Sequence, residues 1–424
     1  MKVYLDNHSA TKIDDLVLEE MLPYLKDNYG NAQSLHELGQ KAKEAIDIAR
    51  ERVSKLINCS PQEIIFTSCG SEANNLAIKG SIMLNNNTNS KHIIVSSIEH
   101  LSVLYSAKRM KQLFGIEYSL LPVDSYGVVK LDELKNLLRE DTILVSVQLA
   151  NPEIGTIQPI KYIAEIIREF NNQRKNKQIK TLLHTDAVAA CGIIDVDVQQ
   201  LGVDMLSLAG SQFYGPKGAA ALFLKKGTKI VPQIDGGIQE DGRRAGTENV
   251  ACIVGLGKAA EIAKNHLEEN FQKMIKLRDK IIHDVPQKIQ YVYLNGHPVN
   301  RLPNNINFSF EFIEGESILL LLNQKGIYVT SGSACTSKAL KLSHVLEAIG
   351  VDAAVAQGSV TFTLSKYTTD EEVEYLLKEL PPIIERLRSL SPLYSYFLKT
   401  GKRMQAGPGT DYEDDHSHIN KEMI

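Results

Sequence analysis

Residues 63–80, EIIFTSCGSEANNLAIKG, place a β-rich run directly before a turn that opens a helix. The run 63–67 (EIIFT) has the length and the β-branched composition of a short strand. The small residues 68–72 (SCGSE) supply the turn. Strands and helical patterns continue to alternate outward from this stretch, up to about residue 224. This alternation predicts an α/β protein with a mainly parallel sheet and crossover helices.

Further strands are predicted from five β-rich runs, at 92–96, 143–147, 181–185, 205–208 and 220–224. Between them, 101–113 and 160–170 carry apolar residues at spacings of three and four, as an amphipathic helix requires. The stretches 36–58 and 250–285 also have helical patterns. Residues 304–322 and 360–398 have the patterns of strands and helices outside this sheet.

We therefore expect a large α/β domain over 15–258 and a smaller α+β domain built from 1–14 together with 259–400. The remaining residues 401–424 have few apolar anchors and clustered acids, so this tail is predicted to be disordered. Four tail residues can hold a metal weakly, although a solvated tail is favoured: Asp414, Asp415, His416 and His418.

The composition excludes several classes of protein. Of 424 residues, 43% are apolar and 23% are charged, which are values of a globular chain. A net charge of −4 disfavours a nucleic-acid partner, because phosphate contacts require an excess of basic residues. No apolar run reaches the roughly 18 residues of a membrane span, and the first residues lack the apolar core of a signal peptide. We expect a cytoplasmic protein with no membrane partner.

Two turns that follow predicted strands carry candidate ligand-binding residues. In open α/β sheets, ligands bind outside the carboxyl ends of the strands. Gly70 and Ser71 follow the first strand and open a helix, whose free backbone N–H groups suit a phosphate. Glu99 and His100 follow the run 92–96. Each of these residues can instead be a helix cap or a structural hydrogen-bonding group.

Two later strand ends add polar side chains. Asn151 and Glu153 follow the run 143–147, and Asp186 follows the run 181–185. An acid at the end of a central strand is the partner that keeps a pyridine nitrogen protonated. A structural hydrogen bond is the alternative for each residue taken singly.

Six motifs together resemble the cysteine desulfurases of the NifS/IscS type, in order from about residue 4 to residue 393. They are YLDNHSAT (4–11), FTSCGSEANNLAIKG (66–80), HTDAVAACG (184–192), YGPKG (214–218), RRAGTENV (243–250) and SGSACTS (331–337). The resemblance implies PLP-dependent transferase fold type I, in its class V aminotransferase form, and a homodimer with pyridoxal phosphate (PLP) near the subunit boundary. It also implies a loop cysteine that takes sulfur from L-cysteine as a persulfide.

The chain departs from this family at the position of the lysine that forms a Schiff base with PLP. That lysine is expected directly before YGPKG, where the chain has Gln212. An amide cannot form the Schiff base or serve as a base. Ser211 stands where the family has a phosphate-binding histidine, and Ala209 where it has a serine. Lys217 is no substitute, because the family has the GPKG lysine alongside the catalytic one.

Three further departures fall in the same predicted pocket. Pro152 replaces an asparagine that contacts the cofactor, and Ala189 replaces a glutamine. Thr361 replaces the arginine that holds the substrate carboxylate, and a hydroxyl cannot form the bidentate clamp of a guanidinium. Archaeal and anaerobe relatives without the lysine share RLPNNINFSF (301–310) and RLRSLSPLY (386–394). We therefore expect that PLP is lost or bound only noncovalently.

Other positions of the family site are retained. The resemblance implies that His100 stacks on the cofactor and that Asp186 pairs with its pyridinium. It implies that Thr247 reaches the phosphate bound by the partner subunit. The predicted cofactor-binding set is Gly70, Ser71, Asn151, Asp186, Ser211 and Thr247, and the predicted catalytic residues are His100 and Cys335.

Cys335 lies among small residues in SGSACTS, a pattern typical of an exposed loop. A thiolate there can carry a persulfide or act as a ligand of an iron–sulfur cluster. The five cysteines are scattered and form no CxxC pair, so neither disulfides nor a zinc site is indicated. The other four are interpreted as structural: Cys59, Cys69, Cys191 and Cys252.

Two functions are consistent with these residues. The preferred hypothesis is a degenerate desulfurase that acts as a dimeric partner of an iron–sulfur scaffold of the IscU type, or of another sulfur acceptor. In this role Cys335 is the persulfide carrier or the ligand of a transient cluster. The alternative is an active PLP-dependent cysteine desulfurase that releases sulfur from L-cysteine and gives alanine.

Overall fold

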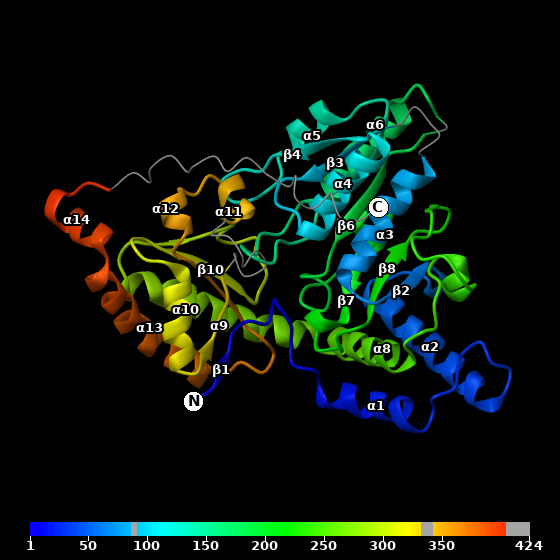
Figure 1. The fold of residues 1–424 in the computed structure, drawn as a ribbon, viewed down its shortest axis with the longest axis horizontal. Coiled ribbons are helices and arrows are strands. Elements are labelled where there is room, and N and C mark those ends of the chain that lie inside the picture. Colours follow the sequence, from blue (N-terminus) through cyan, green and yellow to red (C-terminus); the bar gives the residue numbers. More distant parts are fainter. Residues whose placement is uncertain (86–90, 178, 332–341, 404–424) are drawn as a thin grey trace, which may run out of the picture.

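The chain folds around a seven-stranded sheet and two smaller sheets (Figure 1). The computed structural model describes residues 1–85, 91–177, 179–331 and 342–403. Cys335 and most of the predicted tail, including its four candidate metal ligands, lie outside the described residues.

The large sheet has the strand order β2-β8-β7-β6-β5-β3-β4. Its strands are β2 (Ile64–Thr67), β3 (His92–Ser96), β4 (Glu117–Leu121), β5 (Thr142–Ser146), β6 (Leu182–Asp186), β7 (Met205–Ala209) and β8 (Ala220–Leu224). β8 runs antiparallel to both of its neighbours, and the other pairs are parallel. The carboxyl ends of six strands therefore share one edge, which confirms the predicted α/β class.

Helices cover both faces of this sheet, and each predicted helical pattern in this part of the chain is present. They are α1 (Asp15–Lys26), α2 (Glu37–Leu56), α3 (Gly70–Leu84), α4 (Leu101–Phe114), α5 (Leu131–Leu137), α6 (Ile160–Gln173), α7 (Val198–Leu201) and α8 (Val250–Asn265). α2 and α8 cross closely, because a β-carbon on Gly257 would lie 2.5 Å from Ala49 Cα. The stretch 250–285 is not one helix: α9 (Leu267–Lys288) begins after a break at His266.

A smaller unit lies at the other end of the molecule in Figure 1. Its antiparallel sheet has the order β12-β10-β9, and β1 pairs with β11 in a separate parallel ribbon. The bounds are β1 (Val3–Tyr4), β9 (Val292–Leu294), β10 (Asn305–Phe310), β11 (Ile327–Tyr328) and β12 (Ser359–Thr363). Its helices besides α9 are α10 (Gly315–Gln324), α11 (His344–Ala348), α12 (Ala353–Ala356), α13 (Asp370–Leu390) and α14 (Pro392–Thr400).

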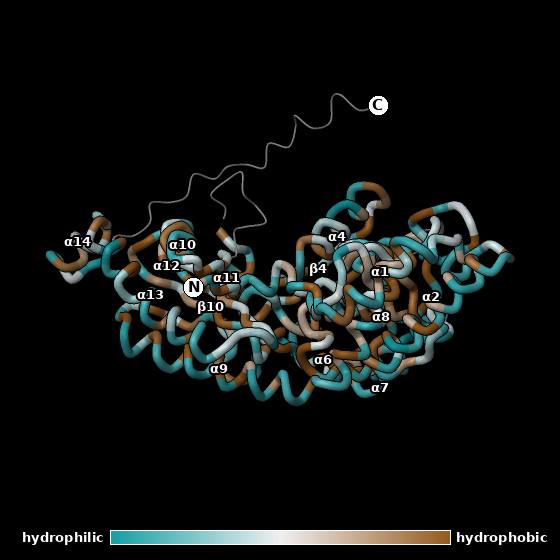
Figure 2. The backbone as a smooth tube through the Cα atoms, turned by 90° about the horizontal axis from the view of Figure 1, so that it is seen from below, coloured by the Kyte–Doolittle hydropathy of each residue, from teal (hydrophilic) through white to brown (hydrophobic). Residues whose placement is uncertain are grey.

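Apolar side chains fill both units. Phe308, Phe310 and Phe362 are fully buried on two adjacent strands of the small sheet, and Figure 2 shows hydrophilic segments along the outer turns of α9. Among the helices in the described parts of the chain, none combines the length and the apolar character of a membrane span. The predicted domain limits at residues 14 and 258 stay a prediction.

Candidate functional site

Asp186 is the last residue of β6 and is 7% exposed. Its Oδ2 accepts a hydrogen bond from Asn74 Nδ2 of α3 at 2.6 Å. The same Asn74 nitrogen donates to Ser102 Oγ of α4 at 2.9 Å, and Ser102 Oγ lies 2.7 Å from His100 Nδ1. A continuous chain of hydrogen bonds therefore joins Asp186 to His100 through two helices that pack side by side.

His100 is the N-cap residue of α4, and its ring is exposed. Its Nδ1 accepts a hydrogen bond from the backbone N–H of Ser102 at 3.1 Å. Because an acceptor nitrogen carries no proton, the network assigns the proton of the neutral ring to Nε2. The exposed ring is thus held in place through Nδ1.

The amino end of α3 lies against the ends of β6 and β7. A β-carbon on Gly70 would lie 2.7 Å from Val188 Cγ2 and 3.7 Å from the Ala209 β-carbon. Ser71 follows in the exposed first turn of α3. Since the first amides of a helix have no partner within it, this end presents free N–H groups at the edge where Asp186 lies.

Ser211 and Gln212 form a 3₁₀ turn, η2 (Gly210–Gln212), directly after β7. Both side chains are half-buried. The carbonyl oxygen of Ser211 accepts hydrogen bonds from the backbone N–H of Thr11 at 2.9 Å and from Thr11 Oγ1 at 3.0 Å. The turn that carries Gln212 is therefore fixed by the N-terminal segment.

The side chain of Asn151 is buried and is used largely by its own loop. Its Oδ1 accepts from the N–H groups of Glu153 and Ile154, both at 2.9 Å, and its Nδ2 donates to the carbonyl of Ile98 at 3.1 Å. Asn305 of β10 donates to the carbonyl of Pro152 at 2.8 Å, which ties this loop to the small sheet. Asn151 is therefore held in place at the edge of the sheet.

Thr361, the residue at the predicted carboxylate clamp, is 1% exposed on β12. Its Oγ1 accepts a hydrogen bond from Asn307 Nδ2 of β10 at 2.7 Å. This side chain therefore serves a cross-strand contact within the small sheet.

Glu99 is a further acid at this edge, and its side chain is 0% exposed. Its Oε1 accepts from Ser96 Oγ at 2.7 Å and from the N–H of Gln148 at 2.6 Å. Burial, together with the nearby negative charge of Asp186, raises the pKa of the Glu99 carboxyl to about 8 against the opposing effect of these two hydrogen bonds. His344 Nε2 of α11 donates to the Glu99 carbonyl at 2.9 Å.

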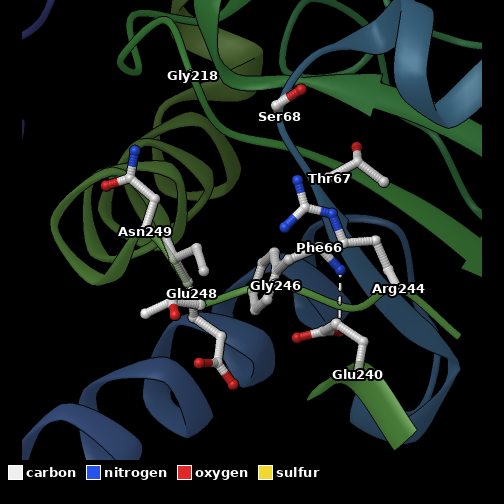
Figure 3. A pocket seen from close by; sticks show the side chains of 11 residues that line it. Phe66, Thr67, Ser68, Gly218, Glu240, Arg244, Gly246, Glu248 and Asn249 are labelled. Carbon is white, nitrogen blue, oxygen red and sulfur yellow. Dashed lines mark hydrogen bonds between the residues drawn. The ribbon is translucent and has the colours of Figure 1, made fainter. Parts of the chain in front are cut away.

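Thr247 lines a polar cavity of about 180 Å³. Figure 3 shows other residues of its lining, among them Ser68 and Arg244. In this cavity Arg244 pairs with Glu72 of α3 at 2.8 Å, and Glu240 Oε2 accepts from the N–H of Phe66 at 2.9 Å. Thr247 itself is exposed. Its predicted contact with a phosphate bound by a partner subunit stays a prediction.

The structure thus brings His100 and Asp186 into one network at the edge where Gly70 also lies. Ser71, Asn151 and Ser211 lie on the turns that surround this edge, whereas Cys335 lies outside the described residues. The sequence interpretation missed the linking residues Asn74 and Ser102. A polar side chain on the buried face of a helix, such as Asn74 within NNLAI, is the signal that indicates such a link.

The fold and this site define a class of enzyme fold, the PLP-dependent fold type I, with its ligand site at the carboxyl ends of the parallel strands. Residues 3–376 match the family described as aminotransferase class-V.

Comparison with individual proteins identifies the family within this class. "Cysteine desulfurase IscS" of Methanosarcina thermophila is 49% identical over 391 residues, which cover 92% of this chain and 94% of the relative. A solved structure described as a NifS-like protein is 40% identical with a TM-score of 0.84, covering 91% of this chain and all of the other. A second, described as SspA in complex with cysteine, is 32% identical with a TM-score of 0.75, covering 87% of this chain and all of the other. The chain belongs to the cysteine desulfurase family of the IscS/NifS type, within the class V aminotransferases.

Proposed function

We propose that this protein is a PLP-dependent cysteine desulfurase that releases sulfur from L-cysteine and gives alanine. The names of its relatives support this function, including the relative in complex with cysteine. The observation that carries the proposal is Asp186: a buried carboxylate that has amide and backbone partners but no ion pair among the described residues. A buried anion without a cation is the partner that a pyridinium nitrogen requires.

The residues at this edge fit PLP. Asp186 would hold the pyridinium nitrogen, and the first amides of α3 at Gly70 and Ser71 would hold the phosphate. His100 offers a ring that is fixed through Ser102. When bound, PLP supplies an electron sink that allows bonds at the α- and β-carbons of the substrate to break.

The atoms and electrons of the overall sulfur transfer balance when one thiol of this chain takes part. The Cβ–S bond of L-cysteine breaks, and an S–S bond forms to Cys335. Of the two thiol hydrogens, one remains on the persulfide and the other ends on the methyl group of alanine. The sulfur is oxidised to the sulfane level and the β-carbon is reduced, so the step needs no outside oxidant. Cys335 is the proposed acceptor because a thiolate is the nucleophile that this step requires.

Gln212 makes the proposed binding of PLP noncovalent, because an amide cannot form the linkage that a lysine amine forms. Retention of the cofactor then depends on Asp186, on the amides of α3 and on His100. We accordingly expect PLP to exchange more readily than in a relative with a lysine at this position.

Gln212 also favours a second candidate function. Here the chain has lost catalysis and acts as a dimeric partner of an iron–sulfur scaffold of the IscU type. Cys335 then carries a persulfide formed elsewhere or binds a transient cluster. Thr361 supports this reading as well, since its hydroxyl cannot replace a guanidinium clamp on the substrate carboxylate.

The deciding experiment uses full-length protein that is purified without oxygen, supplied with PLP and then given L-cysteine. We expect alanine, and a persulfide that mass spectrometry locates on Cys335. Cys335→Ser should lose both, whereas Cys59→Ser, which removes a half-buried thiol, should keep both. If no alanine forms although PLP is bound, the desulfurase proposal is wrong. A Cys335-dependent gain in cluster formation on a scaffold would then support the second candidate.

A further inference from the structure

Glu99 is a buried acid for which the proposed chemistry gives no role. Two donors, Ser96 Oγ and the N–H of Gln148, converge on its Oε1. Its other oxygen, Oε2, is buried and has no hydrogen-bond partner in the described parts of the chain. This asymmetry is the pattern of a neutral carboxylic acid, in which the carbonyl oxygen accepts both bonds and the other oxygen carries the proton. An ionised carboxylate would leave a charged oxygen buried without a donor, which is costly.

The surroundings of Glu99 also favour its neutral form. Asp186, at the end of β6, is a second carboxylate near it, and two buried like charges oppose each other. From α11, His344 reaches only the backbone carbonyl of Glu99, and burial lowers the pKa of this histidine. His100 follows directly in the chain but directs its Nδ1 to Ser102. No cation among these neighbours therefore compensates an ionised Glu99.

The contacts of Glu99 join three elements around the site. Its carboxyl links the end of β3, through Ser96, to the end of β5, through Gln148. Its carbonyl holds the first residue of α11, His344. The next residue in the chain is His100, so the position of that ring depends on these contacts.

We propose that Glu99 is a positioning residue of the cofactor site which acts as a neutral carboxylic acid, joining the ends of β3 and β5 beside His100 and leaving Asp186 as the anion of the pocket. The part of this inference that concerns PLP rests on the proposed function, whereas the neutral state of Glu99 does not. Ionisation of Glu99 at alkaline pH introduces a charge that the pocket cannot satisfy. Water then enters between the strand ends, and the cofactor is held less tightly.

The first test uses the protein without PLP, so that it does not depend on catalysis. Infrared spectra of the wild type at neutral pH should contain a protonated-carboxyl band that is absent from Glu99→Gln and that disappears as the pH rises through about 8. Glu153→Gln is the matched control, because Glu153 is a second buried glutamate, whose pKa is raised to about 7 by burial. Glu153→Gln should keep the band of Glu99 and lose a different protonated-carboxyl band. Identical spectra for the wild type and Glu99→Gln would overturn the proposal.

The second test measures PLP affinity against pH. The wild type should lose about tenfold in affinity for each pH unit above about 8, as linkage to one proton requires. Glu99→Gln, which copies the neutral acid, should keep its neutral-pH affinity and lack this decline. Glu99→Leu leaves Ser96 and Gln148 without their acceptor and should bind weakly at every pH. Parallel declines in the wild type and Glu99→Gln would overturn the proposal. Absence of PLP binding by both would instead overturn the proposed function, and the infrared test would then decide the state of Glu99.

Discussion

Gly70 and Val188 meet at a point where no further atom fits, since a β-carbon on residue 70 would lie 2.7 Å from Val188 Cγ2. One residue begins the helix that follows β2, and the other lies in the turn after β6. The close approach fixes the amino end of α3 next to Asp186. The proposed phosphate and pyridinium contacts thus have a defined separation because glycine stands at residue 70.

Gly70→Ala should lower the free energy of unfolding by about 1–3 kcal/mol, the usual cost of adding a methyl group to a tightly packed position. The added carbon displaces α3, so PLP affinity should fall as well. Val188→Ala in the same chain removes the atom that clashes and should recover both quantities. Urea unfolding and PLP titration of the two single variants and the double variant measure the coupling. Strictly additive effects would show that the two side chains do not compete for the same space.

Asp186→Asn should weaken PLP binding by roughly 10- to 100-fold, because a hydrogen bond to a charged group contributes about 1.5–3 kcal/mol. Asp204→Asn is a suitable control. Asp204 is also buried, but it binds Lys180 and the N–H of Leu183 at the opposite edge of the sheet. That variant should lose stability and keep its PLP affinity. Equal losses of affinity in both variants would mean that Asp186 has only a structural role.

Gln212→Lys should gain a covalent link to PLP, which borohydride reduction and mass spectrometry detect as a fixed adduct. Its turnover of L-cysteine should nevertheless remain low, because Thr361 cannot clamp the substrate carboxylate. Adding Thr361→Arg should raise kcat/KM by roughly 10- to 100-fold, mainly through KM, as expected for a charged hydrogen bond of about 1.5–3 kcal/mol. Circular dichroism checks that the buried arginine leaves the fold intact. Full turnover by the single variant would show that Thr361 is not limiting.

The contribution of two buried histidines to the unfolding free energy should decrease as the pH falls below about 6.5, the ordinary pKa of histidine. His92 and His184 are buried within the sheet, and burial lowers their pKa values to about 4 and about 3. At these two side chains the unfolded chain therefore binds more protons than the folded chain in this range, and their contribution to stability is lost on acidification. Each histidine contributes at most about 1.4 kcal/mol per pH unit. Urea titrations of the wild type and His184→Gln test this, and the variant should have a shallower acid limb.

The buried glutamates have the opposite effect on how the unfolding free energy depends on pH. The raised pKa values of Glu99 and Glu153 mean that the folded chain retains protons that the unfolded chain releases above about pH 4.5. Between about pH 4.5 and 6.5, the glutamates therefore offset the effect of the histidines on the unfolding free energy. Above that range the glutamates act alone, and stability should fall toward pH 8. A wild-type profile that stays level from pH 6.5 to 8 would contradict this assignment for the glutamates.

The large sheet was predictable because most of its strands are continuous apolar runs. Glu117–Leu121 (β4) escaped prediction, since this edge strand is only partly buried and its sequence EYSLL lacks a strong pattern. The reversed direction of β8 could not be predicted either, because residue periodicity is the same for both directions of a strand. The helix break at His266 has no proline or glycine beside it to signal it.

The site was predictable only in part, because some of its contacts join segments that are far apart in the sequence. Asp186 and His100 follow strands, so the rule on strand ends placed both at one edge. Asn74 and Ser102 join them because α3 packs beside α4, and this contact between helices is not encoded by spacing within either helix. The unpartnered oxygen of Glu99 depends on three separate segments, so only the folded chain reveals it.

The position of β8 has a consequence for synthesis of the chain. β2 pairs with β8 alone in the large sheet, and β8 ends at Leu224. While the ribosome is still making the residues between them, β2 has no strand to pair with, although α3 and the rest of the sheet can already form. Such a delayed, non-local pairing slows folding and leaves an unpaired strand exposed to other chains. The strand that leads into the amino end of α3 at Gly70 is therefore paired only after β8 has been made, late in translation.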